Sequence, residues 1–216
     1  MSIRLDAIGF DLDGTLWDGT ETVAKTWKRV CEKDARIKKV PQMEDIQGIM
    51  GLTVEEISGK LFPELTLEQG LEVIDICCQE EVQDILAEGG RLFDGLAEVL
   101  EELSRKYKLY IVSNCNPGYI EAFLEHHQLA QYFCDHEDHG STMLPKGENI
   151  RLVMERNHFE SSIYVGDTPG DCKAAREAGI PFIHAAYGFG EVEGGWQLHD
   201  IRELPRLVED LLAQGF

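Results

Sequence analysis

The stretch of residues 11–14, Asp-Leu-Asp-Gly, constrains this chain more than any other. It follows an apolar run, residues 7–10, whose composition predicts a short buried strand that ends at Asp11. Because side chains alternate along an extended backbone, Asp11 and Asp13 point to the same side. Two neighbouring carboxylates repel each other unless a cation or a shared proton lies between them. The stretch therefore predicts either a functional pair of carboxylates or, as the alternative, a simple turn at Gly14.

The overall charge limits the partners that this protein can have. With 20 Lys and Arg against 40 Asp and Glu, the formal net charge is −20. Nucleic acids and anionic membranes bind basic surfaces, so we expect neither as a partner. A phosphorylated substrate would meet a repulsive field, and its site would have to be made positive locally by a metal or a few cations.

Length and composition indicate an ordinary soluble protein. The chain has 216 residues, 43% of them hydrophobic and 28% charged, which suits one domain with a large insert or two small domains. We find no apolar run near the ~18 residues that span a bilayer, and no signal-peptide pattern. The six cysteines form no CxxC pair, which indicates reduced thiols. These features predict a cytoplasmic location and leave the oligomeric state open.

Residues 18–90 predict an all-helical insert placed directly after the two aspartates. An apolar stripe over residues 21–37 predicts its first helix. The patterns Thr-x-x-Glu at 53–56 and Thr-x-x-Gln at 66–69 resemble capping boxes. The second of them predicts a long helix that ends at Gly89.

From residue 94 onward the pattern changes to alternating helices and strands. The clearest apolar runs predict three strands: 108–113, 162–166 and 181–186. Such alternation predicts a parallel sheet covered by helices on both faces, a doubly wound α/β fold. We therefore expect an α/β core made of residues 1–17 and 91–216, with the helical insert at 18–90.

Several shorter segments of the core carry weaker signals. Asn116 and Pro117 predict the start of a helix, as N-cap and first-turn residues. Residues 131–134 predict a short strand. Residues 135–139, Asp-His-Glu-Asp-His, have the composition of a metal site but predict a solvated loop, and residues 191–196 predict a surface loop.

Polar side chains stand where three of the predicted strands end. Asp11 and Asp13 follow the first strand, Ser113 and Asn114 end the second, and Asp167 follows the third. Ligands of parallel α/β sheets bind beyond the carboxyl ends of the strands, so we expect these side chains to share one site.

Two further charged residues lie at the starts of helices. Asp171 falls in the first turn of the helix after Asp167, beside the positive end of the helix dipole. Lys146 begins another predicted helix, where a cation opposes the dipole. Such a placement requires a local reason.

These residues, in this order, resemble the four motifs of the haloacid dehalogenase-like phosphohydrolases that carry a helical cap between the first and second motifs. The matching residues are Asp11-x-Asp13-Gly-Thr-Leu, Ser113-Asn114, Lys146 and Gly166-Asp167-x-x-x-Asp171. The resemblance covers essentially the whole chain, and four motifs in order are far more specific than any one of them. The third motif departs from the family pattern, because the family often has Lys-Pro where this chain has Lys146-Gly147.

The resemblance implies a Mg²⁺-dependent phosphatase that acts on a small phosphorylated metabolite. Asp11 would attack phosphorus and form an aspartyl-phosphate. Asp13 would give a proton to the leaving oxygen and later take one from the hydrolytic water. The ion would be held by Asp11, Asp167 and the backbone carbonyl of Asp13.

The same resemblance assigns the remaining motif residues to the phosphate. Ser113, Asn114 and Lys146 would hold its non-bridging oxygens as charge develops. Asp171 would orient Lys146 or a metal-bound water.

Two activities within the family stay open at this stage. The chain is similar to phosphoglycolate phosphatases, and the alternative is a phosphomutase of the β-phosphoglucomutase type. The fourth motif of those mutases typically carries a Glu-Asp pair where this chain has Gly166-Asp167, which favours hydrolysis.

The cap implied by the resemblance gives one indication about the substrate. Loop 46–53 carries Gly48 and Gly51, which allow close approach to a ligand, and it contains no Arg or Lys. The nearest cation in the cap is Lys60. We therefore expect a small leaving group that is neutral or weakly charged, such as a sugar or polyol, because a carboxylate or second phosphate would need a cation beside it. The alternative is that this loop merely packs on the core, and Trp17 likewise either contacts substrate or packs.

Overall fold

The centre of the protein is a six-stranded sheet in which every neighbouring pair is parallel. The computed structural model describes residues 4–215, and the order of the strands in the sheet is β5-β4-β1-β6-β7-β8. Their bounds are β1 Ala7–Phe10, β4 Lys108–Ser113, β5 Phe133–Asp138, β6 Ser162–Gly166, β7 Phe182–Ala185 and β8 Trp196–Leu198. The three central strands are almost fully buried, as their continuous apolar runs require.

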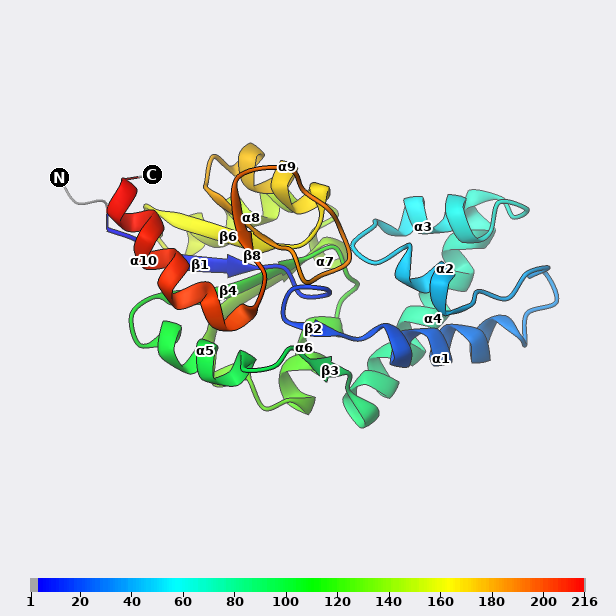
Figure 1. Cartoon of the computed structure of the whole chain (residues 1–216). Coiled ribbons are helices and arrows are strands. Elements are labelled where there is room, and N and C mark those ends of the chain that lie inside the picture. The colour runs from blue at the N-terminus through cyan, green and yellow to red at the C-terminus, as the bar shows by residue number, and fades with distance from the viewer. Residues whose placement is uncertain (1–3, 216) are drawn as a thin grey trace.

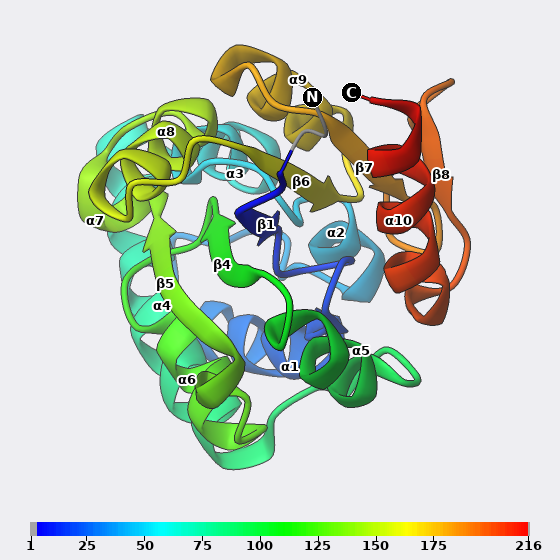
Figure 2. The ribbon, with the colours of Figure 1, turned by 90° about the vertical axis from the view of Figure 1, so that its left-hand side faces the viewer.

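Helices cover both faces of this sheet, which confirms the predicted doubly wound α/β fold. They are α5 Leu96–Ser104, α6 Tyr119–His126, α8 Lys146–Arg156, α9 Pro169–Ala178 and α10 Leu204–Gln214, with a short α7 at His139–Thr142. In Figure 2, α8 and α9 lie on one side of the strands and α5 and α6 on the other. The buried apolar residues accordingly form two clusters, the smaller one under α8 and α9.

The described elements between residues 20 and 88 are all helices joined by turns and loops, as predicted. They are α1 Thr20–Cys31, α2 Met43–Gln47, α3 Val54–Leu61 and α4 Leu67–Glu88. Figure 1 shows them as a separate lobe beyond the carboxyl ends of the strands, with α4 reaching back to α6. No helix among residues 4–215 is long and apolar enough to cross a membrane.

A small antiparallel ribbon lies at the junction of the insert and the core. Its strands are β2, Trp17–Asp18, and β3, Arg91–Leu92. The segment that enters the insert and the segment that leaves it are therefore paired side by side. This ribbon falls at the predicted borders of the two domains. The division itself, 1–17 with 91–216 and 18–90, stays a prediction.

Two helix boundaries differ from their sequence predictions. Helix α1 ends at Cys31, six residues before the predicted end of the helix at residue 37. Helix α6 begins at Tyr119 after Gly118, which has a φ of 89°, rather than at Asn116-Pro117. The Asn116 side chain does not cap the helix, because its amide donates to Cys78 Sγ of α4 at 2.6 Å.

The acidic segment after residue 132 is a strand, and its prediction as a solvated loop was wrong. Strand β5 occupies Phe133–Asp138 at the edge of the sheet, so the short strand predicted at 131–134 was placed too early. The guanidinium of Arg156 pairs with Asp135 and Glu137, both at 2.6 Å, and so neutralises two carboxylates of the strand. Asp138 accepts a hydrogen bond from the Ser141 N–H at 2.7 Å and caps α7. These carboxylates therefore have structural partners.

The segment predicted as a surface loop at 191–196 differs from the prediction at its last residue. Trp196 begins β8, which pairs with β7 in parallel and closes the far edge of the sheet. This three-residue strand is too short to produce a pattern in the sequence.

Candidate active site

The pairing of strands brings the predicted site residues to one edge of the sheet. Strand β1 lies between β4 and β6, with Phe10 opposite Ile111 on one side and Val165 on the other. The residues that follow these three strands are therefore neighbours in space, although more than 100 residues separate the first strand end from the last in the sequence.

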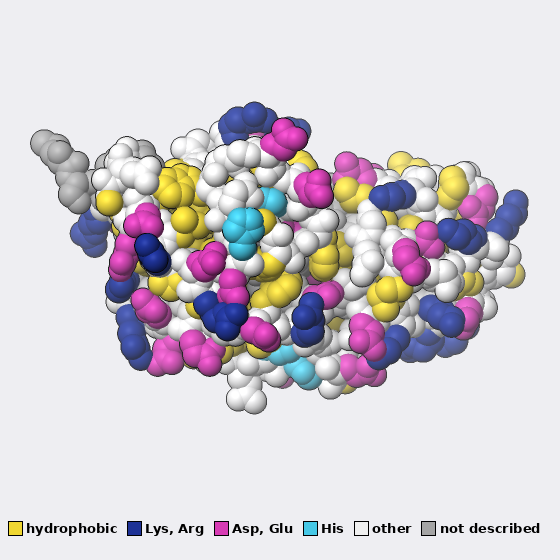
Figure 3. Space-filling view, viewed as in Figure 1, with side chains coloured by type: hydrophobic (Ala, Val, Ile, Leu, Met, Phe, Trp, Pro, Cys, Tyr) yellow, Lys and Arg dark blue, Asp and Glu magenta, His cyan; other side chains and the backbone are white. Residues whose placement is uncertain are grey.

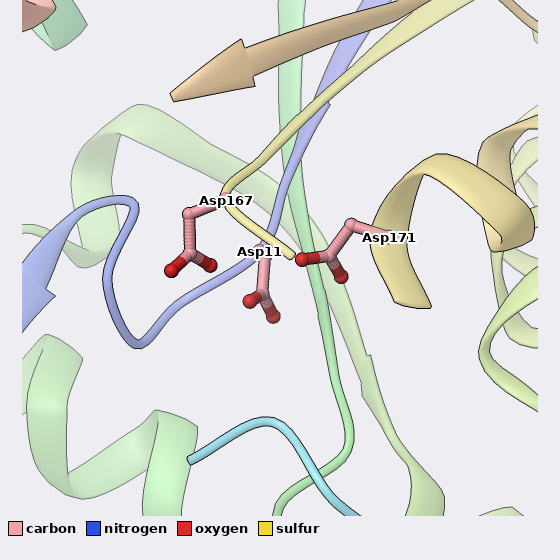
Figure 4. A group of neighbouring side chains, drawn as sticks. All are labelled: Asp11, Asp167 and Asp171. Carbon is pink, nitrogen blue, oxygen red and sulfur yellow. The ribbon is translucent and has the colours of Figure 1, made fainter. Parts of the chain in front are cut away.

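Three aspartates form a buried cluster at this edge. One carboxylate oxygen from each of Asp11, Asp167 and Asp171 lies within 4.8 Å of the others. Figure 4 shows the three side chains converging from β1, from the end of β6 and from the first turn of α9. All three are 2% exposed or less. Burial first, and then the charge of Asp171, raise the pKa of both Asp11 and Asp167 to about 7.

The cluster fits a divalent cation. Asp167 Oδ1 is buried without a hydrogen-bond partner among the described residues, whereas its other oxygen accepts from the Phe189 N–H at 2.6 Å. A buried carboxylate oxygen without a partner is costly, and a hard cation such as Mg²⁺ takes oxygen ligands of this kind. Asp11, Asp167 and Asp171 could therefore supply ligands. The carbonyl of Asp13, which the resemblance implied as a ligand, stays a prediction.

Lys146 lies against two members of this cluster. Its Nζ donates to Asp11 Oδ1 at 2.8 Å and to Asp171 Oδ1 at 2.6 Å. Burial alone would lower the pKa of Lys146, but the two carboxylates outweigh burial and raise it above its usual range. These contacts explain why a lysine begins α8 against the helix dipole. They also agree with the predicted role of Asp171 in orienting Lys146.

Asp13 has a different environment from Asp11. The residue as a whole is only partly buried, and the hydroxyl of Tyr119 donates to Asp13 Oδ1 at 2.9 Å. Burial and the charge of Asp11 raise the pKa of Asp13 to about 7. A carboxyl that titrates near neutral pH is suited to both giving and taking a proton.

Ser113 and Asn114 lie at the end of β4, beside the aspartates. Ser113 is buried. The Asn114 amide donates to the carbonyl of Gly51 at 2.9 Å, which joins the loop of the insert directly to the core. The structure thus brings all seven predicted site residues to the same edge.

A cleft of about 660 Å³ opens between the insert and the core at this point. Asn114, Lys146 and Thr168 line it from the core, and loop 47–53 lines it from the insert. On the face shown in Figure 3, acidic and basic side chains are interspersed. Among the residues that line the cleft, Lys146 and Lys173 carry positive charge, so a phosphate bound there would have cations beside it.

Two residues left open by the sequence have defined contacts. Trp17 is fully buried, and its ring centroid lies 5.0 Å from that of Phe123 on α6, so it packs in the core. Lys60 is exposed and donates to the carbonyl of Gly48, in the loop that lines the cleft.

The sequence did not reveal several residues that support the site. His184 of β7 lies with Nε2 3.1 Å from the carbonyl oxygen of Asp167. Gly188 is needed for close approach, because a Cβ there would come within 2.3 Å of the Asp167 Cβ. The glycines at 188 and 190, following a strand, were the available signal for this loop. Tyr119 carried no signal, since it lies in an ordinary amphipathic helix.

Comparison with known proteins gives the class. Residues 8–185 match the family model described as haloacid dehalogenase-like hydrolase. The chain therefore belongs to this family, which confirms the predicted family and the prediction of an enzyme of the hydrolase class.

Relatives and solved structures of similar shape agree with this class. The chain is 26% identical over 196 residues to an N-acetylmuramic acid 6-phosphate phosphatase of Pseudomonas putida, covering 87% of this chain and 85% of that one. It is 27% identical over 197 residues to a phosphoglycolate phosphatase of Vibrio parahaemolyticus, covering 86% of each.

Two crystal structures share the fold across nearly the whole chain. A predicted phosphoglycolate phosphatase from Haemophilus somnus superposes with a TM-score of 0.82 at 19% identity, over 96% of this chain and 100% of that one. A β-phosphoglucomutase from Clostridium difficile superposes with a TM-score of 0.77 at 13% identity, over 98% of each chain.

Proposed function

We propose that this protein is a Mg²⁺-dependent phosphatase that hydrolyses a small phosphorylated metabolite through an aspartyl-phosphate. The observation that carries the proposal is the position of Asp11 after a central strand, where it belongs to the buried aspartate cluster and accepts a hydrogen bond from Lys146. A nucleophile, a cation and a candidate metal site therefore meet at one point. The family relationship supports the same activity.

The first half of the proposed reaction uses Asp11 and Asp13. A carboxylate oxygen of Asp11 forms a bond to phosphorus while the bond from phosphorus to the leaving oxygen breaks. Asp13 gives its proton to that oxygen, so the product leaves as a neutral alcohol. Mg²⁺, bound by Asp11 and Asp167, would screen the charge between nucleophile and phosphate.

The second half regenerates the enzyme. Asp13, now ionised, takes a proton from a water molecule whose oxygen attacks phosphorus, and the bond between phosphorus and Asp11 breaks. Ser113, Asn114 and Lys146 would donate hydrogen bonds to the phosphoryl oxygens in both halves. Asn114 would exchange its bond to the Gly51 carbonyl for one to phosphate.

The structure also bears on the alternative, a phosphomutase. A Cβ added at Gly166 would lie 2.6 Å from the Cβ of Asp171, so the glutamate typical of the mutases does not fit here without a shift of α9. This contact favours hydrolysis.

The proposal is tested by measuring phosphate release from a panel of phosphate esters with and without Mg²⁺. We expect Mg²⁺-dependent release that is lost in Asp11→Asn. Isomerisation of a sugar phosphate without net phosphate release would instead identify a mutase.

A further inference from the structure

A small cavity lies between the helical insert and the core, beside Asp13. Its volume is about 60 Å³, and it is lined by helices α1, α3 and α4 on one side and by the end of β4 and α6 on the other. At the ~30 Å³ that a water molecule occupies in the liquid, the cavity has room for a fragment of a few non-hydrogen atoms. Under the proposed function Asp13 protonates the leaving oxygen. The group attached to that oxygen would therefore enter this cavity.

The wall that the insert contributes to this cavity carries a carboxyl, that of Glu81 on α4. The residue is 6% exposed, and the indole N–H of Trp27 donates to its Oε2. No described residue donates a hydrogen bond to its other oxygen, Oε1. The lining residues include neither Lys nor Arg. A buried carboxyl, one oxygen of which accepts no hydrogen bond from a described residue, thus lines the cavity next to Asp13, and no Lys or Arg lines the cavity with it.

We propose that Glu81 determines specificity, by selecting an uncharged leaving group that carries a hydroxyl and by rejecting one that carries a carboxylate or a second phosphate. This inference rests on the proposed phosphatase function. A second anion in the cavity would be desolvated between Asp13 and Glu81 with no opposite charge. A hydroxyl brings no charge to desolvate and can donate its hydrogen bond to the unused oxygen of Glu81.

This inference predicts a substrate preference that differs from the phosphoglycolate phosphatase activity named for several relatives of this chain. Glycolate, the leaving group of phosphoglycolate, carries a carboxylate. The chain is therefore expected to hydrolyse phosphoglycolate poorly and glycerol 3-phosphate well.

The competing role for Glu81 is purely structural, as the acceptor for the Trp27 indole. Glu81→Gln separates the two roles, because glutamine keeps the size and the acceptor oxygen but removes the charge. Glu80→Gln is the matched control: it removes the same charge one residue away, where the side chain is 49% exposed and pairs with Arg29 at 2.8 Å.

The experiment measures kcat/KM of the Mg²⁺-loaded enzyme for glycerol 3-phosphate, phosphoglycolate and 4-nitrophenyl phosphate. Burial raises the pKa of Glu81 to about 8, so assays at pH 9 keep the carboxyl ionised. Asp13, with a pKa of about 7, has then largely lost its proton. This slows the hydrolysis of both alkyl esters and cancels in the ratio of their kcat/KM values. We expect wild type to prefer glycerol 3-phosphate over phosphoglycolate. Glu81→Gln should shrink that preference by about tenfold or more, chiefly by raising the value for phosphoglycolate, while Glu80→Gln should leave it unchanged.

Each other outcome overturns a stated part of the reasoning. Hydrolysis of 4-nitrophenyl phosphate with the same preference in wild type and Glu81→Gln would overturn the role of Glu81 alone. A wild-type preference for phosphoglycolate would overturn the assignment of the leaving group. Failure of the wild type to hydrolyse all three esters would overturn the proposed function, and the inference with it.

Discussion

Replacing Asp167 with Asn should stabilise the protein in the absence of divalent cations. The side chain belongs to a cluster of three buried carboxylates, and the pKa of Asp167 is raised from an ordinary 3.8 to about 7 by burial and by Asp171. At ~1.4 kcal/mol for each tenfold change, this difference corresponds to about 4 kcal/mol of destabilisation when the carboxyl is ionised. Because Asp11 and Asp171 share the repulsion, we expect Asp167→Asn to recover roughly 1–3 kcal/mol.

The direction of the pKa shift of Asp167 determines the pH range in which Asp167→Asn stabilises the protein. A carboxyl whose pKa is higher in the folded than in the unfolded state destabilises the fold fully above the folded value and not at all below the unfolded one. The gain from Asp167→Asn should therefore be complete at pH 8 and vanish near pH 4. The hydrogen bond from the Phe189 N–H survives, because the asparagine carbonyl oxygen can accept it.

The assay is thermal melting followed by circular dichroism, in EDTA and in Mg²⁺. For a chain of this size ~1 kcal/mol moves the Tm by about 2–4 °C, so Asp167→Asn should melt roughly 2–12 °C higher than wild type in EDTA at pH 8. With Mg²⁺ the difference in Tm should shrink or reverse, because saturation at ~100 times Kd adds about 2.7 kcal/mol to wild type and less to the variant.

Asp210→Asn is the matched control for this experiment. It removes the same charge from α10, where the side chain is 56% exposed and its nearest cation, Arg206, is 3.9 Å away. Its Tm should stay close to that of wild type in both buffers. A lower Tm for Asp167→Asn in EDTA at pH 8, or an equal rise of both proteins in Mg²⁺, would refute the reasoning about the cluster.

Three further substitutions test the proposed roles one residue at a time. Asp11→Asn should abolish turnover, because no other group lies where the covalent intermediate must form; substantial phosphate release from a pure sample would remove Asp11 as nucleophile. Asp13→Asn should lower kcat for an alkyl phosphate by about 10²–10⁴-fold, the usual contribution of a positioned acid–base group, and wild-type turnover of that ester would exclude it from proton transfer. Lys146→Met should lower the Tm in EDTA, since breaking a buried ion pair costs ~3–5 kcal/mol; an unchanged melting curve would contradict the contacts to Asp11 and Asp171.

The central strands could be predicted from the sequence because local composition determines them. The segments Lys108–Ser113 and Ser162–Gly166 are apolar, flanked by polar residues and buried on both faces, and the structure keeps the predicted bounds. Helix α9 was equally clear, because Thr168, Pro169 and Asp171 form its capping box and first turn.

The errors in the fold arose where a distant residue decides a local structure. Strand β5 carries three acidic residues among its last four, a composition that does not predict a strand. Arg156, from a helix that follows it, pairs with Asp135 and Glu137. Asn116 was expected to cap α6, but its amide bonds to Cys78 in the helical insert. Neither partner can be identified from sequence patterns of a few residues.

The same distinction explains which parts of the candidate site could be predicted. Asp11, Ser113 and Asp167 end neighbouring strands, so a prediction of the strands already places them together. Strand pairing does not place the residues that line the small cavity beside Asp13. Tyr119 reaches Asp13 from a helix of the core. Glu81 lies on a long helix of the insert, and the packing of α4 against α6 brings it to the cavity beside Asp13. The motif residues that end strands could therefore be located from the sequence, whereas the leaving-group preference that we propose depends on how the insert packs on the core.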